Sequence, residues 1–340
     1  MKAGILYANE DIRYTETEPP RAGQGEVVVK VKMTGICGSD VPRVLNNGAH
    51  YYPIILGHEF SGEIFEIGEG VENFSIGERV SGAPLVPCMK CEDCQKGFFS
   101  LCKYYTFIGS REPGSFAEYV KLPATNAIKF DPAISFEQGA FFEPSTVPLH
   151  GLKCANYKGG GDVAILGGGT IGLFTAQWAK IFGAKSVTVF DISEKRLELA
   201  KKLGADYTVN TLTDTVENGK YNYVLETAGQ IPTMHMAFDA AANKSSICFI
   251  GTPHENISFT PKQWENMNRK EFNLTGSWMS YSAPFPGDEW INTAHYFKTG
   301  QLKFDNELIF KKYHMSEIKD AFMLYRKPEN VGGKILLYND

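Results

Sequence analysis

A run of apolar residues that ends in closely spaced glycines constrains the fold of this chain more than any other feature. The run is VAILGGGTIGLF, residues 163–174, and its glycines fit the pattern G-x-G-x-x-G between a strand-forming segment and a helix-forming one. Such glycines permit a tight turn and a close approach of the backbone to a pyrophosphate, and the helix N-terminus offers unpaired N–H groups to the anion. The run predicts a dinucleotide-binding turn, with the candidate cofactor-binding residues Gly167, Gly169, Thr170, Ile171 and Gly172.

An acidic residue at the end of the next strand-like segment supports this interpretation. Asp191 closes SVTVFD nineteen residues after Gly172, where a carboxylate can accept hydrogen bonds from ribose hydroxyls and repel a 2′-phosphate. The pattern therefore favours NAD over NADP. Arg196, on the following helical segment, is a further candidate cofactor-binding residue, although charges on a helix are often only solvated. The alternative is that the glycines merely turn a strand into a helix.

The order of strand-like and helix-like segments divides the chain into two expected domains. From residue 162 onward, Val- and Ile-rich segments alternate with helical ones, which predicts an α/β fold with a doubly wound parallel sheet over residues 148–276. The first 145 residues contain short β-forming runs cut by Gly and Pro, typical of antiparallel strands. We expect residues 277–340, which end in the strand-like KILLY, to rejoin residues 1–147, although a small third unit fits their composition equally.

The composition excludes several classes of protein. The chain has 340 residues, 43% of them hydrophobic, and a net charge of −5, so it offers no basic excess to nucleic acid. It contains no run of eighteen uncharged apolar residues, and the apolar run at residues 3–8 is too short for a signal peptide. We therefore expect a cytoplasmic protein without a membrane span, in which clustered cysteines bind metal more readily than they form disulfides.

Four cysteines crowd into the stretch PCMKCEDCQKGFFSLC, and their spacing suits one tetrahedral metal ion. The separations of two, two and seven residues let a single loop wrap four thiolates around zinc, with no position left open for a substrate. We interpret residues 87–103 as a structural zinc lobe. An iron–sulfur cluster, a redox switch or buried free thiols are the alternatives. The candidate ligands are Cys88, Cys91, Cys94 and Cys102.

A second candidate metal site combines residues that lie far apart in the sequence. Cys37 in TGICGSD, His58 and Glu59 in GHEF, and Glu143 in FFEP provide a thiolate, an imidazole and carboxylates, which can bind zinc and leave a position for an alcohol. Singly, each has a simpler explanation: a buried thiol, a core histidine, or an acid that caps a helix. Spacing alone does not show that they meet.

Taken in order, these motifs resemble the zinc-dependent medium-chain alcohol and polyol dehydrogenases. The resemblance rests on G-x-C-G-S-D, G-H-E-x-x-G, the four-cysteine lobe, an acid before the cofactor domain, and the glycine turn, and it covers essentially the whole chain. It implies a GroES-like catalytic domain, a Rossmann domain, and one catalytic and one structural zinc ion per subunit. It also implies NAD-dependent, reversible oxidation of a secondary alcohol, by a homodimer or homotetramer.

The resemblance assigns a role to each candidate residue. Cys37, His58 and Glu143 match the catalytic zinc ligands, and the four clustered cysteines match the structural ones. Glu59 matches an acid that enters the coordination sphere when substrate is absent. Asp40 matches a carboxylate that fixes the tautomer of the ligating histidine, and Ser39 matches a hydroxyl that relays the substrate proton.

One position departs from the family pattern. Many members carry a histidine five residues after the zinc cysteine, and this chain has Pro42 there. The proton path beyond Ser39 is therefore open, and water, the cofactor ribose or His50 could complete it.

The segments 46–62, 103–119 and 274–290 resemble members of the family that act on polyol phosphates. A polyol phosphate is therefore the expected substrate, and Arg43 and Arg111 are candidate phosphate-binding residues because an arginine fork matches a phosphate. Both could equally be ordinary surface charges. Alternatives are a free polyol such as sorbitol, another secondary alcohol such as threonine, or a catalytically silent NAD-binding protein.

Overall fold

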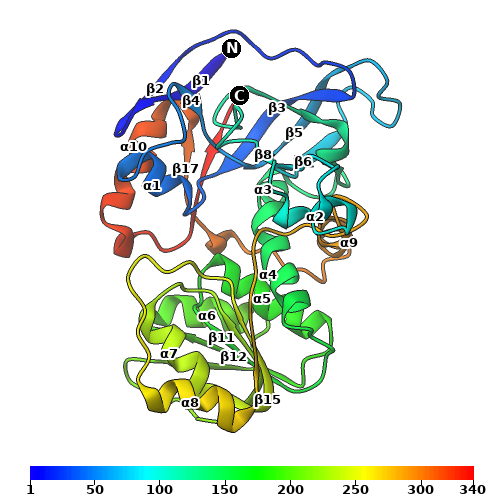
Figure 1. Ribbon diagram of the computed structural model, residues 1–340. Helices are drawn as coiled ribbons and strands as arrows, with labels where there is room; N and C mark the ends of the chain where they lie inside the picture. The colour runs from blue at the N-terminus through cyan, green and yellow to red at the C-terminus, as the bar shows by residue number, and fades with distance from the viewer. The chain divides into compact units, whose positions relative to one another are not determined.

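The computed structural model describes residues 1–340, and the chain forms two compact units. Unit 1 comprises Met1–Glu143, Tyr281–Gly300 and Asn306–Asp340, and unit 2 comprises Pro144–Ser280 and Gln301–Asp305. The colours of Figure 1 show that unit 1 contains both the beginning and the end of the chain. The C-terminal segment therefore forms no third unit.

The boundaries differ by a few residues from those expected at 147/148 and 276/277, because residues 144–147, 277–280 and 301–305 belong to unit 2. The hydroxyl groups of Thr146 and Ser280 are hydrogen-bonded at 2.7 Å. The backbone N–H of Lys303 donates to the side chain of Gln177 at 2.7 Å. The indole N–H of Trp178 also donates to the carbonyl group of Ser145 at 2.8 Å. The first bond thus joins residues 144–147 to residues 277–280, and the other two attach these segments and residues 301–305 to the rest of unit 2. No local sequence pattern predicts these long-range contacts.

Unit 2 is built on a parallel sheet of six strands in the order β13-β12-β11-β14-β15-β16. This is the doubly wound Rossmann order, with the first strand, β11, in the middle of the sheet. The strands are β11 (Asp162–Leu166), β12 (Ser186–Asp191), β13 (Tyr207–Asn210), β14 (Tyr221–Glu226), β15 (Ala241–Phe249) and β16 (Asn273–Gly276). The predicted α/β fold is confirmed.

Helices pack against this sheet in unit 2 (Figure 1). They are α5 (Thr170–Ile181), α6 (Glu194–Leu203), α7 (Ile231–Ala240) and α8 (Pro261–Lys270), and α4 (Phe142–Cys154) begins just before the unit boundary. Helix α6 ends at Gly204, whose φ of +112° is the left-handed conformation that glycine adopts without strain. Residues 163–166 of β11 are fully buried, as expected for a central parallel strand.

Unit 1 is β-rich and largely antiparallel. Its largest sheet follows the order β10-β6-β5-β3-β18-β17, with β9 also paired to β3, and two smaller sheets have the orders β2-β1-β4 and β7-β8. The strands are β1 (Lys2–Ala8), β2 (Asp11–Glu16), β3 (Glu26–Gly35), β4 (Ile54–Ile55), β5 (Glu59–Ile67), β6 (Arg79–Gly82), β7 (Leu85–Val86), β8 (Thr106–Phe107), β9 (Tyr119–Pro123), β10 (Ala127–Lys129), β17 (Ile309–His314) and β18 (Lys334–Tyr338). Because β18 pairs with β3, the C-terminal strand returns to the N-terminal domain as predicted.

Short helices complete unit 1: α1 (Asp40–Leu45), α2 (Glu92–Gln95), α3 (Phe136–Ala140), α9 (Asp288–Lys298) and α10 (Ile318–Met323). Helix α10 buries Ile318, Ala321 and Phe322, which fall on one face of the helix. None of the helices is long and apolar enough to cross a membrane.

Candidate functional site

Strand pairing brings three of the predicted metal-binding residues together. Strands β3 and β5 are antiparallel, and their register places Gly35 opposite Glu59. Cys37 follows β3 by two residues and His58 directly precedes β5, so the pairing brings both side chains to one end of the strand pair. The potential ligand atoms of Cys37, His58 and Glu59 all lie within 4.8 Å of one another. A side chain at Gly35 would displace the carboxylate of Glu59 from its place in the site.

Asp40 links two of these residues. Its Oδ2 accepts a hydrogen bond of 3.1 Å from the backbone N–H of Cys37, and its Oδ1 lies 3.5 Å from Nδ1 of His58. A distance of 3.5 Å exceeds that of an ordinary hydrogen bond, but the carboxylate is fully buried and faces the ring. A carboxylate in this place can orient the imidazole so that its other nitrogen binds a metal. The ring of Phe107 packs edge-on against His58, with centroids 5.5 Å apart.

Glu143 lies near this group but is not one of the three residues whose ligand atoms converge. Burial raises the pKa of its carboxyl group to about 7, and the nearby His58 opposes this effect while Glu59 adds to it. The region therefore holds a thiol and several carboxyl groups in little water. A divalent cation would offset this accumulation of negative charge, and thiolate, imidazole and carboxylate are the ligands that zinc prefers.

Lys334 is a member of the site that sequence reasoning missed. Its ammonium group lies 2.7 Å from both carboxylate oxygens of Glu59, and its side chain is 10% exposed. Burial alone would lower the pKa of Lys334, but the Glu59 carboxylate raises it well above its usual value. The only sign of Lys334 in the sequence is that it is the one charged residue in the apolar segment KILLY. This sign does not identify its partner Glu59, which lies 275 residues away in the chain.

The four cysteines of the lobe lie close enough together to hold one metal ion. The sulfur atoms of Cys88, Cys91, Cys94 and Cys102 all lie within 4.8 Å of one another, and none of the cysteines is in a disulfide. The sulfur atoms of Cys91 and Cys102 are 3.8 Å apart. The backbone N–H groups of Cys88 and Cys91 each donate to a cysteine sulfur at 3.3 Å. A backbone N–H at Cys94 lowers the pKa of the Cys91 thiol to about 6, which favours a thiolate ligand.

The glycine turn in unit 2 has the geometry that its sequence predicts. Gly167 has a φ of +113°, and a side chain on Gly172 would overlap the carbonyl group of Gly167. Gly169 is the N-cap of α5, and a Cβ atom there would meet open space. Thr170 and Ile171 are the first two residues of α5. The turn thus presents the N-terminus of α5 with room for a ligand beside it.

Asp191 ends β12 beside this turn. Its Oδ2 accepts a hydrogen bond of 2.7 Å from the backbone N–H of Gly168, and its Oδ1 accepts one of 2.9 Å from Ser193. The guanidinium group of Arg196 lies 3.6 Å from the same carboxylate. The predicted acid and the predicted cation therefore lie together at the end of the strand.

The remaining predicted residues of unit 1 lie on two segments, one at α1 and one after β8. Ser39 is exposed and directly precedes α1, while Arg43 lies within α1 and donates to the carbonyl group of Ser39. Arg111 lies in the loop after β8 and stacks on Tyr105, with its guanidinium carbon 4.5 Å from the ring centroid. In the segment between β16 and α9, Tyr281 is buried in unit 1 and Trp278 is 55% exposed in unit 2.

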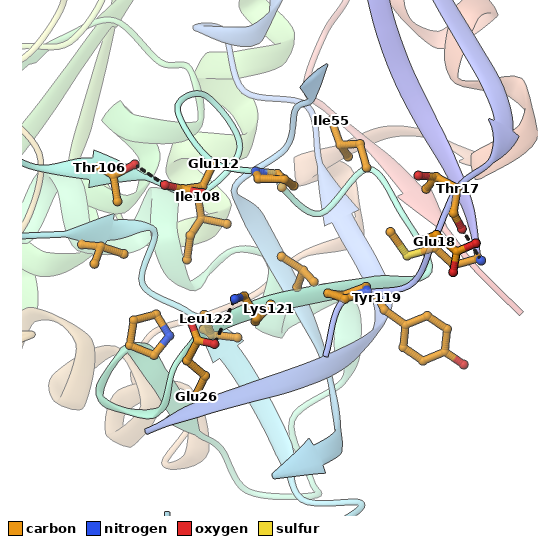
Figure 2. A pocket seen from close by; sticks show the side chains of 17 residues that line it. Thr17, Glu18, Glu26, Ile55, Thr106, Ile108, Glu112, Tyr119, Lys121 and Leu122 are labelled. Carbon is orange, nitrogen blue, oxygen red and sulfur yellow. Dashed lines mark hydrogen bonds and ion pairs between the residues drawn. The ribbon is translucent and has the colours of Figure 1, made fainter. Parts of the chain in front are cut away.

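A separate cavity of about 510 Å³ opens in unit 1. Figure 2 shows its wall of β9 residues and the ion pair between Lys121 and Glu26, at 2.9 Å. Ile55 and Ile108 also line the cavity, but none of the predicted site residues does. The cavity is therefore distinct from the candidate metal site.

Two protein-family models match separate parts of the chain. Residues 23–132 match the model of the alcohol dehydrogenase GroES-like domain, and residues 170–293 match that of the zinc-binding dehydrogenases. The first range contains every cysteine of the lobe together with Cys37 and His58, and the second begins at the glycine turn.

Individual proteins match over most of the chain. Galactitol 1-phosphate 5-dehydrogenase of Escherichia coli K12 is 42% identical over 314 residues, which cover 90% of this chain and 91% of the relative. The crystal structure of galactitol-1-phosphate dehydrogenase from Escherichia coli superposes with a TM-score of 0.94 at 38% identity and full coverage of both chains. Sorbitol dehydrogenase of Bacillus subtilis is 32% identical over 269 residues, covering 75% of this chain and 76% of the relative.

A structure described as a zinc-binding dehydrogenase of Sinorhizobium meliloti 1021 bound to NADP has a TM-score of 0.87 at 28% identity, with 99% of each chain covered. The chain therefore belongs to the zinc-dependent alcohol and polyol dehydrogenase family, and it is an oxidoreductase. The resemblance expected from its motifs is confirmed.

Proposed function

We propose that the protein oxidises galactitol 1-phosphate to the ketose phosphate tagatose 6-phosphate and transfers the hydride to NAD. The observation that carries this proposal is the 42% identity to galactitol 1-phosphate 5-dehydrogenase over 90% of the chain. The reaction is balanced when a secondary C–H and its O–H become a carbonyl group, NAD accepts the hydride, and one proton is released.

In this proposal Cys37, His58 and Glu143 hold a catalytic zinc ion. The convergence of Cys37 and His58 supports it, as does the position of Asp40 behind the imidazole. Bound there, zinc would act as a Lewis acid and lower the pKa of a hydroxyl group, as it does for water, to about 7. Glu59 would serve as an alternative carboxylate, which Lys334 holds in place between turnovers.

The protein's own groups would then position the substrate and move its proton. The hydroxyl group of Ser39, exposed beside α1, would accept the proton of the substrate hydroxyl. Pro42 has no side chain that could carry this proton further, so we propose that water completes the path. The four cysteines of the lobe would hold a second, structural zinc ion, supported by their mutual distances.

The glycine turn would bind the dinucleotide. Backbone N–H groups at the start of α5 can donate to a pyrophosphate, and the open space at Gly169 supports a close approach of the phosphates. Asp191 would accept hydrogen bonds from the ribose hydroxyls. We propose NAD as the cofactor because this carboxylate opposes a 2′-phosphate, even though the related protein from Sinorhizobium meliloti is described with NADP.

The test combines metal analysis with a substrate panel. Elemental analysis should find two zinc ions per chain, and formation of NADH should be fastest with galactitol 1-phosphate among galactitol 1-phosphate, galactitol, sorbitol and threonine. A higher kcat/KM for sorbitol or galactitol would replace the proposed substrate with a free polyol, the alternative that the sorbitol dehydrogenase relative favours. No turnover of any of these compounds by zinc-loaded protein would contradict the proposal.

Two further properties belong to the proposal. We propose that the protein works in the cytoplasm, where reducing conditions keep the cysteine ligands free for metal. We also propose a homodimer or homotetramer, as the family resemblance implies, in which the exposed edge strand β16 is the element available for pairing between subunits. Sedimentation at micromolar concentration measures the assembly directly.

A further inference from the structure

Three basic side chains of unit 1 lie on segments that adjoin the candidate metal site. They are Arg43, His50 and Arg111, which we call the basic cluster. Burial lowers the pKa of His50, and the positive charges of Arg111 and then Arg43 lower it further, so both guanidinium groups lie within electrostatic reach of the ring. The hydroxyl group of Tyr51 donates to the backbone carbonyl of Arg111 at 3.4 Å, which links the two segments directly.

Arg43 lies on a helix that contacts His58, and the backbone N–H of Arg111 donates at 2.8 Å to the carbonyl group of Phe107, whose ring contacts the same histidine. Arg43 belongs to α1, whose first residue, Asp40, lies 3.5 Å from the imidazole. Arg111 follows Phe107 by four residues, and Phe107 packs against the same imidazole. The basic cluster therefore flanks the metal-ligating group without being part of it.

The two arginines lack the acidic partners that most other arginines of the chain have. Arg13, Arg21, Arg196, Arg269 and Arg326 each form an ion pair with a carboxylate, at 2.7 to 3.6 Å. Arg43 instead donates to the Ser39 carbonyl, and Arg111 stacks on Tyr105 and donates to its hydroxyl group at 3.3 Å. These contacts hold the side chains in place but leave their charges uncompensated. Such guanidinium groups can each give two parallel hydrogen bonds to a phosphate.

The geometry points to the basic cluster as the subsite for the phosphate group of the substrate, with Arg43 and Arg111 as its charged ligands and His50 as a third donor. This inference rests on the proposed function and deepens it. In galactitol 1-phosphate the oxidised carbon and the phosphate lie near opposite ends of the molecule. Residues that bind the phosphate must therefore lie near the candidate metal site but outside it, as the basic cluster does. The cluster would make the enzyme prefer phosphorylated over free polyols.

The test compares two substrates that differ only in the phosphate. Arg111→Gln and Arg43→Gln should each raise KM for galactitol 1-phosphate by about 10- to 100-fold, the usual effect of losing a charged hydrogen bond. The kcat/KM for galactitol should change less than about twofold. His50→Gln should have a smaller effect in the same direction. Arg21→Gln, at an exposed arginine away from the cluster, is the matched control and should change neither substrate's kinetics.

Inorganic phosphate provides a second readout that does not depend on the identity of the polyol. It should inhibit the unmodified enzyme competitively, and this inhibition should weaken in the Arg43 and Arg111 variants. Equal losses with both substrates, or unchanged inhibition by phosphate, would overturn the inference. If the unmodified enzyme oxidises galactitol faster than galactitol 1-phosphate, the proposed function is contradicted. The subsite would then stand only if the variants still lose phosphate inhibition. Melting curves identify any variant that fails to fold. If Arg111→Gln fails to fold, Arg111→Lys replaces it, and its KM for galactitol 1-phosphate should lie between that of the unmodified enzyme and that expected for Arg111→Gln.

Discussion

Lys334 is the one buried cation paired with Glu59, so this side chain sets the charge balance of the candidate metal site. Removing it would leave the Glu59 carboxylate buried and unpaired, and breaking a buried ion pair in this way costs about 3–5 kcal/mol. A zinc ion that binds the freed carboxylate would recover part of that loss. Lys334→Met should therefore lower the melting temperature of the metal-free protein more than that of the zinc-loaded protein.

The measurement is differential scanning calorimetry of both forms, with Lys311→Met as a control on the neighbouring strand β17, where Lys311 is exposed. Equal destabilisation of the metal-free and zinc-loaded forms would show that Lys334 has only a structural role. The same experiment on Glu59→Gln should give a smaller difference between the two forms, because the carboxylate available to zinc is then absent.

Asp191 and Arg196 provide a second test with single side chains. Asp191→Ser removes the carboxylate that we expect to oppose a 2′-phosphate. Arg196, whose guanidinium group lies 3.6 Å from that carboxylate in the parent protein, can then pair with the phosphate. The ratio of kcat/KM for NADP to that for NAD should rise by roughly 100-fold or more, since each charged interaction contributes about tenfold or more. Asp191→Asn keeps an acceptor for the Gly168 N–H and should shift the ratio less. An unchanged ratio would exclude Asp191 from cofactor selection.

At the level of strands and helices, local features were predictable and long-range ones were not. The glycine turn, the strand before it and the acid after it lie within about thirty residues, and each was predicted correctly because its spacing is fixed by one βαβ unit. The meeting of Cys37 with His58 depends instead on the register of β3 against β5, which spacing does not encode. The partnership of Lys334 with Glu59 depends on β18 returning to β3, and no motif marks it.

The glycine turn offers a matched pair of substitutions at its two ends. At Gly172 an added methyl group would overlap the backbone of Gly167, and overpacking of this kind costs about 1–3 kcal/mol. At Gly169 the methyl group meets open space and φ is −73°, so the fold tolerates it. Gly172→Ala should lower both the melting temperature and NADH affinity, whereas Gly169→Ala should lower NADH affinity alone. Fluorescence titration with NADH measures the affinity. Normal NADH affinity in the Gly169→Ala variant would contradict the proposal that the glycine turn binds the cofactor.

Across the whole molecule, we expect the two candidate metal sites to differ in role. The site of Cys37 should serve activity, and the four-cysteine lobe should serve stability. The lobe from Cys88 to Cys102 contains only two short helices, α2 and a single 3₁₀ turn, and exposes Met89, Phe98 and Leu101 to solvent. The lobe has little hydrophobic core of its own, so we expect its fold to depend on a metal ion bound by the four sulfur atoms. Cys37 lies instead just after β3, which pairs with β5, β9 and β18, and we expect this sheet to form without metal.

Cys94→Ser and Cys37→Ser should therefore each reduce the zinc content from two ions per chain to one, with different consequences. Cys94 is 5% exposed among the other sulfur atoms, so its loss should lower the melting temperature by several degrees, about the effect of 1–2 kcal/mol or more in a domain of this size. Cys37→Ser should abolish alcohol oxidation and leave the melting temperature within about 2 °C of the parent's, because its partners remain folded. Elemental analysis, calorimetry and NADH formation measure the three quantities on the same samples. Two zinc ions retained in either variant, or loss of stability in the Cys37 variant alone, would contradict this division between the sites.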